Sequence, residues 1–211
     1  MTIMKKIRKF LILILLFFVG SWVYQNNYEV RAAANDSISS LRDYFTHSNS
    51  DNVTATRSSS NNNQATWSRS EATVYVDLQS NAEFEAATEA AINAWNKTGA
   101  FTFKRVNSRR NAQIVVTAMN TNETTAAGVT STIYNPITTH LLRANVRLNS
   151  YYLQNPSYNY SFDRVVNTVE HELGHAIGLG HNRGASVMYP AGSYYGIRPN
   201  DINRVRSLYN S

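Results

Sequence analysis

His171, Glu172, His175, Gly178 and His181 are the residues whose types and spacing point most directly to chemistry. Two histidines four positions apart on a helix lie one turn apart on the same face. Their imidazole nitrogens can therefore bind one Zn²⁺, at about 2.0–2.1 Å each. A glycine three residues later tolerates a positive φ, so the helix can end and the chain can turn back. This reversal predicts His181 as the third ligand.

Glu172 follows the first histidine and can reach a zinc-bound water without ligating the metal itself. Three protein ligands leave a fourth position open for that water, as in catalytic zinc sites. The ion lowers the pKa of the water toward about 7, and Glu172 is predicted to act as the general base. The alternative is an amphipathic helix with surface histidines, but three of the five histidines in the chain fall within residues 171–181.

The segment 171–181 resembles the extended zinc motif of the metzincin metalloproteases. Met188 lies seven residues after His181, and the segment 186–190 around it is similar to the Met-turn of that clan. The short gap and the Met-Tyr-Pro ending are most similar to the matrixin branch. The resemblance covers about residues 72–209 and implies a zinc endopeptidase in which Met188 forms a hydrophobic base under one catalytic zinc.

The residue pattern predicts strands that alternate with helices early and helices that dominate late, an α+β or α/β domain. The resemblance implies the α+β metzincin fold, a twisted, mostly parallel sheet with an antiparallel edge strand, an active-site helix and a C-terminal helix. The predicted strands are 73–78, 101–106, 112–119, 126–132 (the edge strand) and 141–149, and the predicted helices are 81–97, 162–179 and a last helix capped by Asn200-Asp201.

Departures from the matrixin pattern limit what the resemblance implies. The chain has no cysteine, so it lacks the thiolate by which matrixin pro-segments inhibit the zinc. Only His47 and His140 remain for a second, structural zinc, so one zinc is predicted, and acidic calcium-binding loops are not evident. His140 is interpreted as a structural histidine. His47 could visit the zinc in an inactive precursor.

Substrate is expected to lie extended along the edge strand and to pair with it through main-chain hydrogen bonds. Gly128, on that strand, is one candidate substrate-binding residue. Val169 and Tyr189, the latter at the start of the loop 189–197, are predicted to wall the pocket beside the scissile bond. That pocket is expected to take an apolar side chain.

The N-terminal part of the chain has a different character. Four cationic residues precede an apolar run of about 15 residues within 10–24, typical of a secretory signal. Residues 1–34 are therefore interpreted as a signal peptide, with a cleavage site at Ala32-Ala33-Ala34, or as an uncleaved signal anchor. Residues 35–70, rich in Ser, Asn and Thr, are interpreted as a flexible linker or short pro-segment. Residues 71–211 are the predicted catalytic domain.

The distribution of charge along the chain argues against a nucleic-acid partner. The formal net charge is +6, but residues 1–34 hold five basic residues and one acidic residue, which leaves +2 for the rest. Nucleic-acid binding is therefore not expected. The predicted protein is a monomeric zinc endopeptidase acting on peptides or proteins, secreted or anchored at the cell surface by residues 10–24. The alternative is a catalytically inactive zinc-containing binding or adhesion module.

Overall fold

A computed structural model describes residues 2–26, 64–191 and 193–209. Contacts divide the chain into two units, residues 1–55 and residues 56–211. His47 and most of the predicted linker lie outside the described residues. The described elements are α1 Thr2–Asn26, β1 Glu71–Asp77, α3 Ala82–Lys97, β2 Thr102–Arg105, η1 Arg109–Asn111, β3 Ile114–Met119, β4 Gly128–Tyr134, β5 Leu141–Asn149, α4 Ser150–Leu153, η2 Pro156–Tyr158, α5 Phe162–Ala176 and α6 Pro199–Tyr209.

Helix α1 holds the apolar run predicted at the N-terminus. Several of its large apolar side chains are exposed, among them Leu15, Phe17 and Trp22 at 62%, 72% and 67%. Within the described part of the chain, no helix is both long enough and apolar enough to span a membrane.

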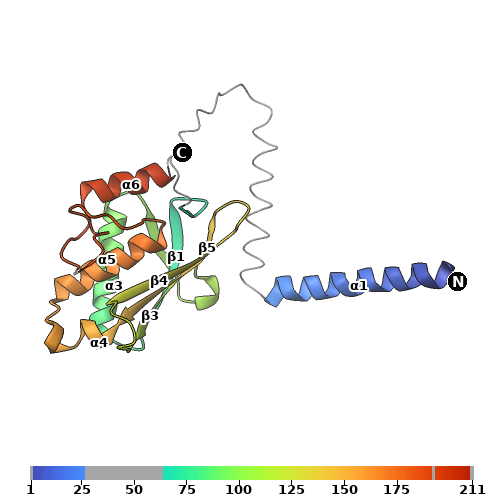
Figure 1. Cartoon of the computed structure of the whole chain (residues 1–211), viewed down its shortest axis with the longest axis horizontal. Coiled ribbons are helices and arrows are strands. Elements are labelled where there is room, and N and C mark those ends of the chain that lie inside the picture. Colours follow the sequence, from blue (N-terminus) through green and yellow to red (C-terminus); the bar gives the residue numbers. More distant parts are fainter. Residues whose placement is uncertain (1, 27–63, 192, 210–211) are drawn as a thin grey trace, which may run out of the picture. The chain divides into compact units, whose positions relative to one another are not determined.

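The second unit is built on a five-stranded sheet with the strand order β2-β1-β3-β5-β4. Each neighbouring pair is parallel except β4 with β5, which is antiparallel and places β4 at the edge. The predicted α+β fold, with its mostly parallel sheet and antiparallel edge strand, is therefore confirmed. Figure 1 shows α3, α5 and α6 gathered on one side of the strands.

The core lies between the sheet and these helices. Period-two positions of the strands, such as Val74, Ile114 and Val146, are fully buried and belong to one hydrophobic cluster with the helices. Helix α3 begins after Asn81, whose side chain accepts from the backbone N–H of Phe84, as a helix N-cap does.

Several predicted boundaries are wrong, and three of these lie in elements that position the site. Helix α5 ends at Ala176 rather than at residue 179, because Gly178 adopts a φ of +94°. Strand β4 runs two residues further along the chain than predicted. The last helix begins at Pro199, so Asn200 and Asp201 lie in its first turn and do not precede it. The short helices η1, α4 and η2 had not been predicted.

Residues 64–70, assigned from the sequence to the linker, belong to the second unit, and Trp67 among them is part of its core. Thr66 forms a parallel bridge with His140, and Trp67 is only 3% exposed within the hydrophobic cluster. The ordered domain thus includes residues upstream of β1.

Candidate metal centre and active site

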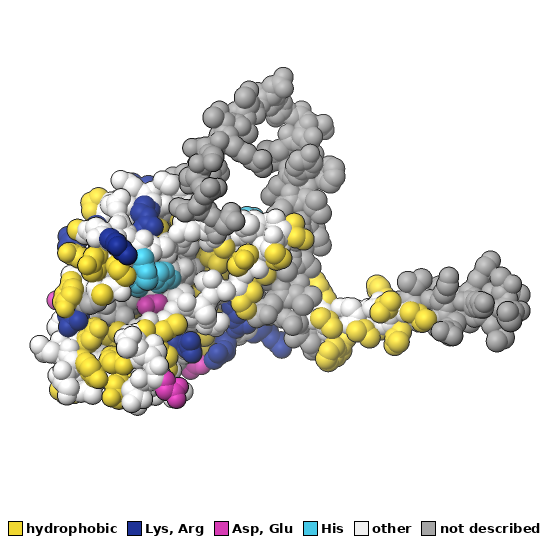
Figure 2. Space-filling model, viewed as in Figure 1, with side chains coloured by type: hydrophobic (Ala, Val, Ile, Leu, Met, Phe, Trp, Pro, Cys, Tyr) yellow, Lys and Arg dark blue, Asp and Glu magenta, His cyan; other side chains and the backbone are white. Residues whose placement is uncertain are grey.

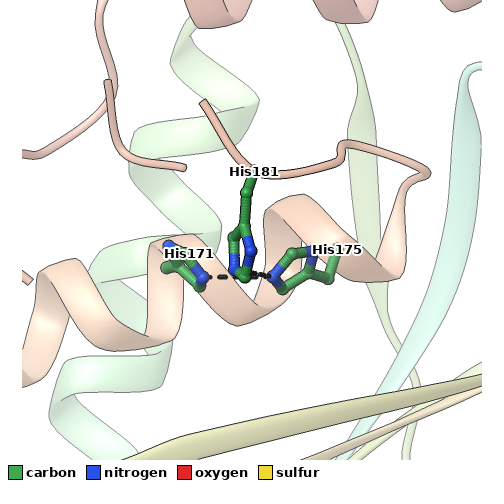
Figure 3. A group of neighbouring side chains, drawn as sticks. All are labelled: His171, His175 and His181. Carbon is green, nitrogen blue, oxygen red and sulfur yellow. Dashed lines mark hydrogen bonds between the residues drawn. The ribbon is translucent and has the colours of Figure 1, made fainter. Parts of the chain in front are cut away.

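The three histidines of the motif meet at one point (Figure 3). Helix α5 supplies His171 and His175 from the same face, and the turn after the helix returns His181 to them. Nε2 of His175 lies 3.0 Å from Nε2 of His171 and 3.2 Å from Nε2 of His181. The reversal depends on Gly178, whose φ of +94° disfavours any residue with a side chain.

Main-chain carbonyls fix the tautomers of two of these rings. Nδ1 of His171 lies 2.7 Å from Val187 O, and Nδ1 of His175 lies 2.8 Å from Leu179 O. A carbonyl only accepts, so each Nδ1 carries the proton and each Nε2 presents a lone pair. Burial, the largest cause, lowers the pKa of His171 and lowers that of His175 to about 4. Both rings are therefore neutral at physiological pH.

This donor set fits a zinc ion. Lone pairs facing one another without a shared proton repel, and a cation between them removes that repulsion. Three nitrogens at about 2.0–2.1 Å from a tetrahedral Zn²⁺ would lie about 3.3 Å from one another, close to the separations found here. The ligand atoms of His171, His175 and His181 all lie within 4.8 Å of one another.

Glu172 lies beside this cluster but does not join it. Its side chain is buried and accepts a hydrogen bond from Thr130 Oγ1 at 2.7 Å. Burial raises the pKa of Glu172 to about 7, against the opposing effect of the Thr130 hydroxyl. A carboxylate with such a pKa can both take and return a proton near neutral pH.

Strand β4 approaches Glu172 so closely that one position must lack a side chain. A Cβ on Gly128 would lie 2.6 Å from Glu172 Cγ and 2.7 Å from Oε1. Gly128, predicted as a substrate-binding residue, therefore also makes room for the glutamate. Thr130, on the same face of β4, had not been predicted, although period-two spacing from Gly128 is a signal that could have found it.

Met188 is fully buried in the segment after His181. Its Sδ lies against Gly174 of α5, where a Cβ could not be added without displacing the sulfur. Its carbonyl accepts from Asn182 N at 2.9 Å, which ties the Met188 segment to the residue following the third histidine. The methionine thus packs beneath the helix turn that presents His175.

Asp201 of α6 holds the same segment from the other side. It is completely buried. Its carboxylate accepts from Ser186 Oγ, and from the backbone N–H groups of Val187 and Arg198 at 3.0 Å each. The sequence interpretation of Asp201 as a cap residue missed this contact with the Met188 segment. Val187 O in turn accepts a hydrogen bond from Nδ1 of His171. Asp201 therefore holds in place the residue that orients a predicted zinc ligand.

A cavity opens over the histidines between β4 and the loop after Met188. Figure 2 shows histidine side chains reaching the surface in this domain. Gly128 and Tyr189, both predicted substrate contacts, line this cavity, whereas Val169 is fully buried in the core and does not line it. The cavity is lined by Thr125, Ala126, Ala127, Gly128, Val129, Thr130, Tyr160, Thr168, His171, Glu172, His175, His181, Tyr189, Pro190, Ala191 and Ser193.

His140 lies apart from the metal-ligand cluster. Its backbone carbonyl accepts from Asn135 N at 2.7 Å, and it pairs with Thr66 just before β5. Among the described residues, the one group of side chains arranged to hold a metal is the three histidines of the motif. His140 is not a member of that group.

The matrixin family model matches residues 59–210 of this chain. The chain belongs to the matrixin family. Comparison with curated protein sequences finds no match. Matrixins are zinc-dependent metalloendopeptidases, and the cluster of His171, His175 and His181 in this matrixin is compatible with the family's zinc site. The match begins upstream of β1 and so includes the ordered residues 64–70.

Proposed function

We propose that this matrixin is an active zinc-dependent endopeptidase, with His171, His175 and His181 as metal ligands and Glu172 as general base. The observation that supports this most strongly is the convergence of three Nε2 atoms beside a buried carboxylate, Glu172, whose pKa burial raises to about 7. A binding module without catalysis has no use for a proton acceptor at that place.

Bound zinc would polarise the scissile carbonyl and make attacking water more acidic. Glu172 takes the proton from that water and then passes it to the leaving amine. This role requires that both protonation states of the Glu172 carboxyl be accessible near neutral pH. Thr130 orients the carboxylate through its hydroxyl. The Nδ1–carbonyl bonds of His171 and His175 leave both Nε2 atoms directed toward His181, where they would hold the zinc.

Strand β4 gives the substrate a place to bind. It is the terminal strand of the sheet, and its first three residues line the cavity beside Glu172 together with the preceding residues 125–127. An extended peptide adding to this edge would gain main-chain hydrogen bonds whatever its sequence. The substrates are accordingly proposed to be extended segments of peptides or proteins. Tyr189 and Gly128 are proposed to contact the substrate. Thr168, which lines the cavity, is proposed to wall the pocket in place of Val169.

The protein is proposed to act outside the cytoplasm, as a monomer that is secreted or anchored by residues 10–24. The basic residues followed by an apolar run are the support for export. The absence of cysteine means that latency through a thiolate on the zinc is not part of this proposal.

The deciding experiment compares the purified chain with Glu172→Gln on casein, with and without a chelator. The wild type is expected to hold one zinc and to cleave casein only without the chelator. The variant is expected to bind as much zinc as the wild type. Its rate of casein cleavage is expected to fall by at least about a thousandfold, which lies in the upper part of the range for loss of an acid–base group. Cleavage by the variant at the wild-type rate would contradict the role of Glu172. A wild type that binds zinc without cleaving would favour the binding-module alternative.

A further inference from the structure

The carbonyl groups at the end of α5 are satisfied in two ways. A helix leaves its last four carbonyls without helical partners. The carbonyls of Leu173, Gly174 and His175 accept hydrogen bonds from backbone N–H groups of residues 177–179 in the turn. The next two carbonyls, those of Ala176 and Ile177, have side-chain donors from distant parts of the chain.

Trp67 and Tyr209 supply those two donors. Trp67 Nε1 donates to Ala176 O at 2.9 Å, and the Tyr209 hydroxyl donates to Ile177 O at 2.9 Å. The same hydroxyl accepts from the backbone N–H of Trp67 at 3.3 Å. The two side chains therefore form one connected network across the end of the helix, and the indole is 3% exposed.

Residues 64–67, here called the strap, also lie against the glycines of the turn. A Cβ on Gly178 would lie 2.7 Å from Ala65 O, and a Cβ on Gly180 would lie 2.9 Å from Gln64 Nε2. Thr66 O accepts from Leu141 N at 2.7 Å, which ties the strap to the start of β5. The strap thus connects the sheet to the turn that ends at His181.

The last carbonyl before His181 is held as well. Arg204 of α6 donates from Nη2 to Gly180 O at 3.0 Å. The five residues between His175 and His181 are therefore fixed from both sides, by the strap and by α6. Their conformation decides where the third imidazole lies relative to the other two, because His181 has no helix of its own to position it.

We propose that the strap, through Trp67 and together with Tyr209, positions the turn that delivers His181, so that metal affinity depends on residues upstream of the first strand. Trp67 is a positioning residue and touches neither the ion nor substrate. Any processing that removes the N-terminal segment from an active enzyme must then cut before Gln64. The inference rests on the proposed zinc site, but not on hydrolysis.

The test uses the full chain with Trp67→Phe and with Trp95→Phe as the matched control. Trp95 is also buried, and its Nε1 also donates to an α5 carbonyl, Glu170 O, at 3.0 Å. That carbonyl lies within the helix and not in the turn. Both variants thus lose one indole donor to α5. The measurements are the zinc dissociation constant, by competition with a chelator, and the melting temperature of the metal-free protein.

Trp67→Phe is expected to weaken zinc binding about tenfold, as loss of groups that orient metal ligands commonly does, while Trp95→Phe changes it less than about twofold. Both are expected to lower the melting temperature of the metal-free protein. Equal zinc affinities in the two variants would overturn the inference. If Trp67→Phe does not fold, Tyr209→Phe replaces it in the same comparison, with the same expected loss. A wild type that binds zinc yet cleaves no casein would overturn the proposed endopeptidase activity but not the role of the strap. A wild type that binds no zinc would overturn both proposals.

Discussion

Thr130 Oγ1 on the edge strand lies 2.7 Å from Oε2 of Glu172 on the active-site helix. The same hydroxyl lies 3.0 Å from the main-chain carbonyl of Glu172. One residue of β4 thus orients the proposed base and joins the strand that would bind substrate to the helix that holds the metal ligands.

Replacing this hydroxyl should change the pH dependence of catalysis. The hydrogen bond to the carboxylate favours its charged form, so Thr130→Val raises the pKa of Glu172 further. Since the base must be ionised to act, the acidic limb of the kcat/KM profile is expected to move up by about one pH unit. Thr132→Val, at an exposed position of the same strand, is the control and should keep the wild-type profile. An unmoved acidic limb in Thr130→Val would contradict the assignment.

Adding a methyl group at Gly128 should displace Glu172. A Cβ there would lie 2.6 Å from Glu172 Cγ, a distance that real structures do not contain. Gly128→Ala is expected to lower kcat at least about tenfold, since misplacement of a catalytic group by about 1 Å can cost a hundredfold. Zinc content should be unchanged. Gly184→Ala, where the nearest atom would be 3.4 Å away, should leave kcat unaltered, and a loss of equal size there would refute the steric explanation.

Removing the carboxylate of Asp201 should destabilise the Met188 segment. Asp201→Ala leaves Ser186 Oγ and the N–H of Val187 buried without their acceptor. The expected loss is about 3 kcal/mol of unfolding free energy in the metal-free protein, from the cost of unpaired buried donors. Urea denaturation measures this loss. The control is Asp163→Ala, at an exposed residue in the first turn of α5. A change within about 0.5 kcal/mol, typical of surface positions, would show that the network contributes nothing.

Tyr209 should make the fold sensitive to alkaline pH. Burial, the largest cause, raises its pKa above the ordinary value, against the effect of the hydrogen bond from Trp67. The unfolded chain ionises this tyrosine at about pH 10, whereas the folded chain keeps the proton to higher pH. Its stabilisation is therefore complete below pH 10 and falls above it, by up to about 1.4 kcal/mol per pH unit.

Urea unfolding at several values between about pH 9 and pH 11 measures this slope. Tyr209→Phe is expected to reduce the loss above pH 10, although it is less stable at neutral pH because Ile177 O loses its donor. Tyr134→Phe, at a tyrosine that is 53% exposed, is the control. A wild type whose alkaline slope equals that of Tyr209→Phe would exclude the buried hydroxyl as its cause.

The parts of the site that are local in the sequence could be predicted. The ligand spacing on α5 and the turn at Gly178 follow from helix geometry and glycine conformation alone. Val169 could have been placed better in the same way. It lies two residues before His171, about 200° around the helix, so it faces the core, whereas Thr168 shares the histidine face.

The parts that could not be predicted depend on contacts between distant residues. Trp67 and Ala176 are 109 residues apart, and Thr130 and Glu172 are 42 apart. No local pattern encodes such a pair. The bounds of β4 were displaced for a related reason, because its Thr and Ser residues give little alternation in hydrophobicity, and its register is set by pairing with β5, as between Gly128 and Leu148.

The edge strand β4 has one more consequence, for the behaviour of the purified protein. Its sequence Gly128–Tyr134 contains no charged residue and no proline, the features that commonly keep edge strands from pairing with one another. A strand left open for one extended chain is open to any other, including a neighbouring copy at high concentration. Samples concentrated for crystallisation or scattering should therefore self-associate, and a peptide-like inhibitor should keep them dispersed.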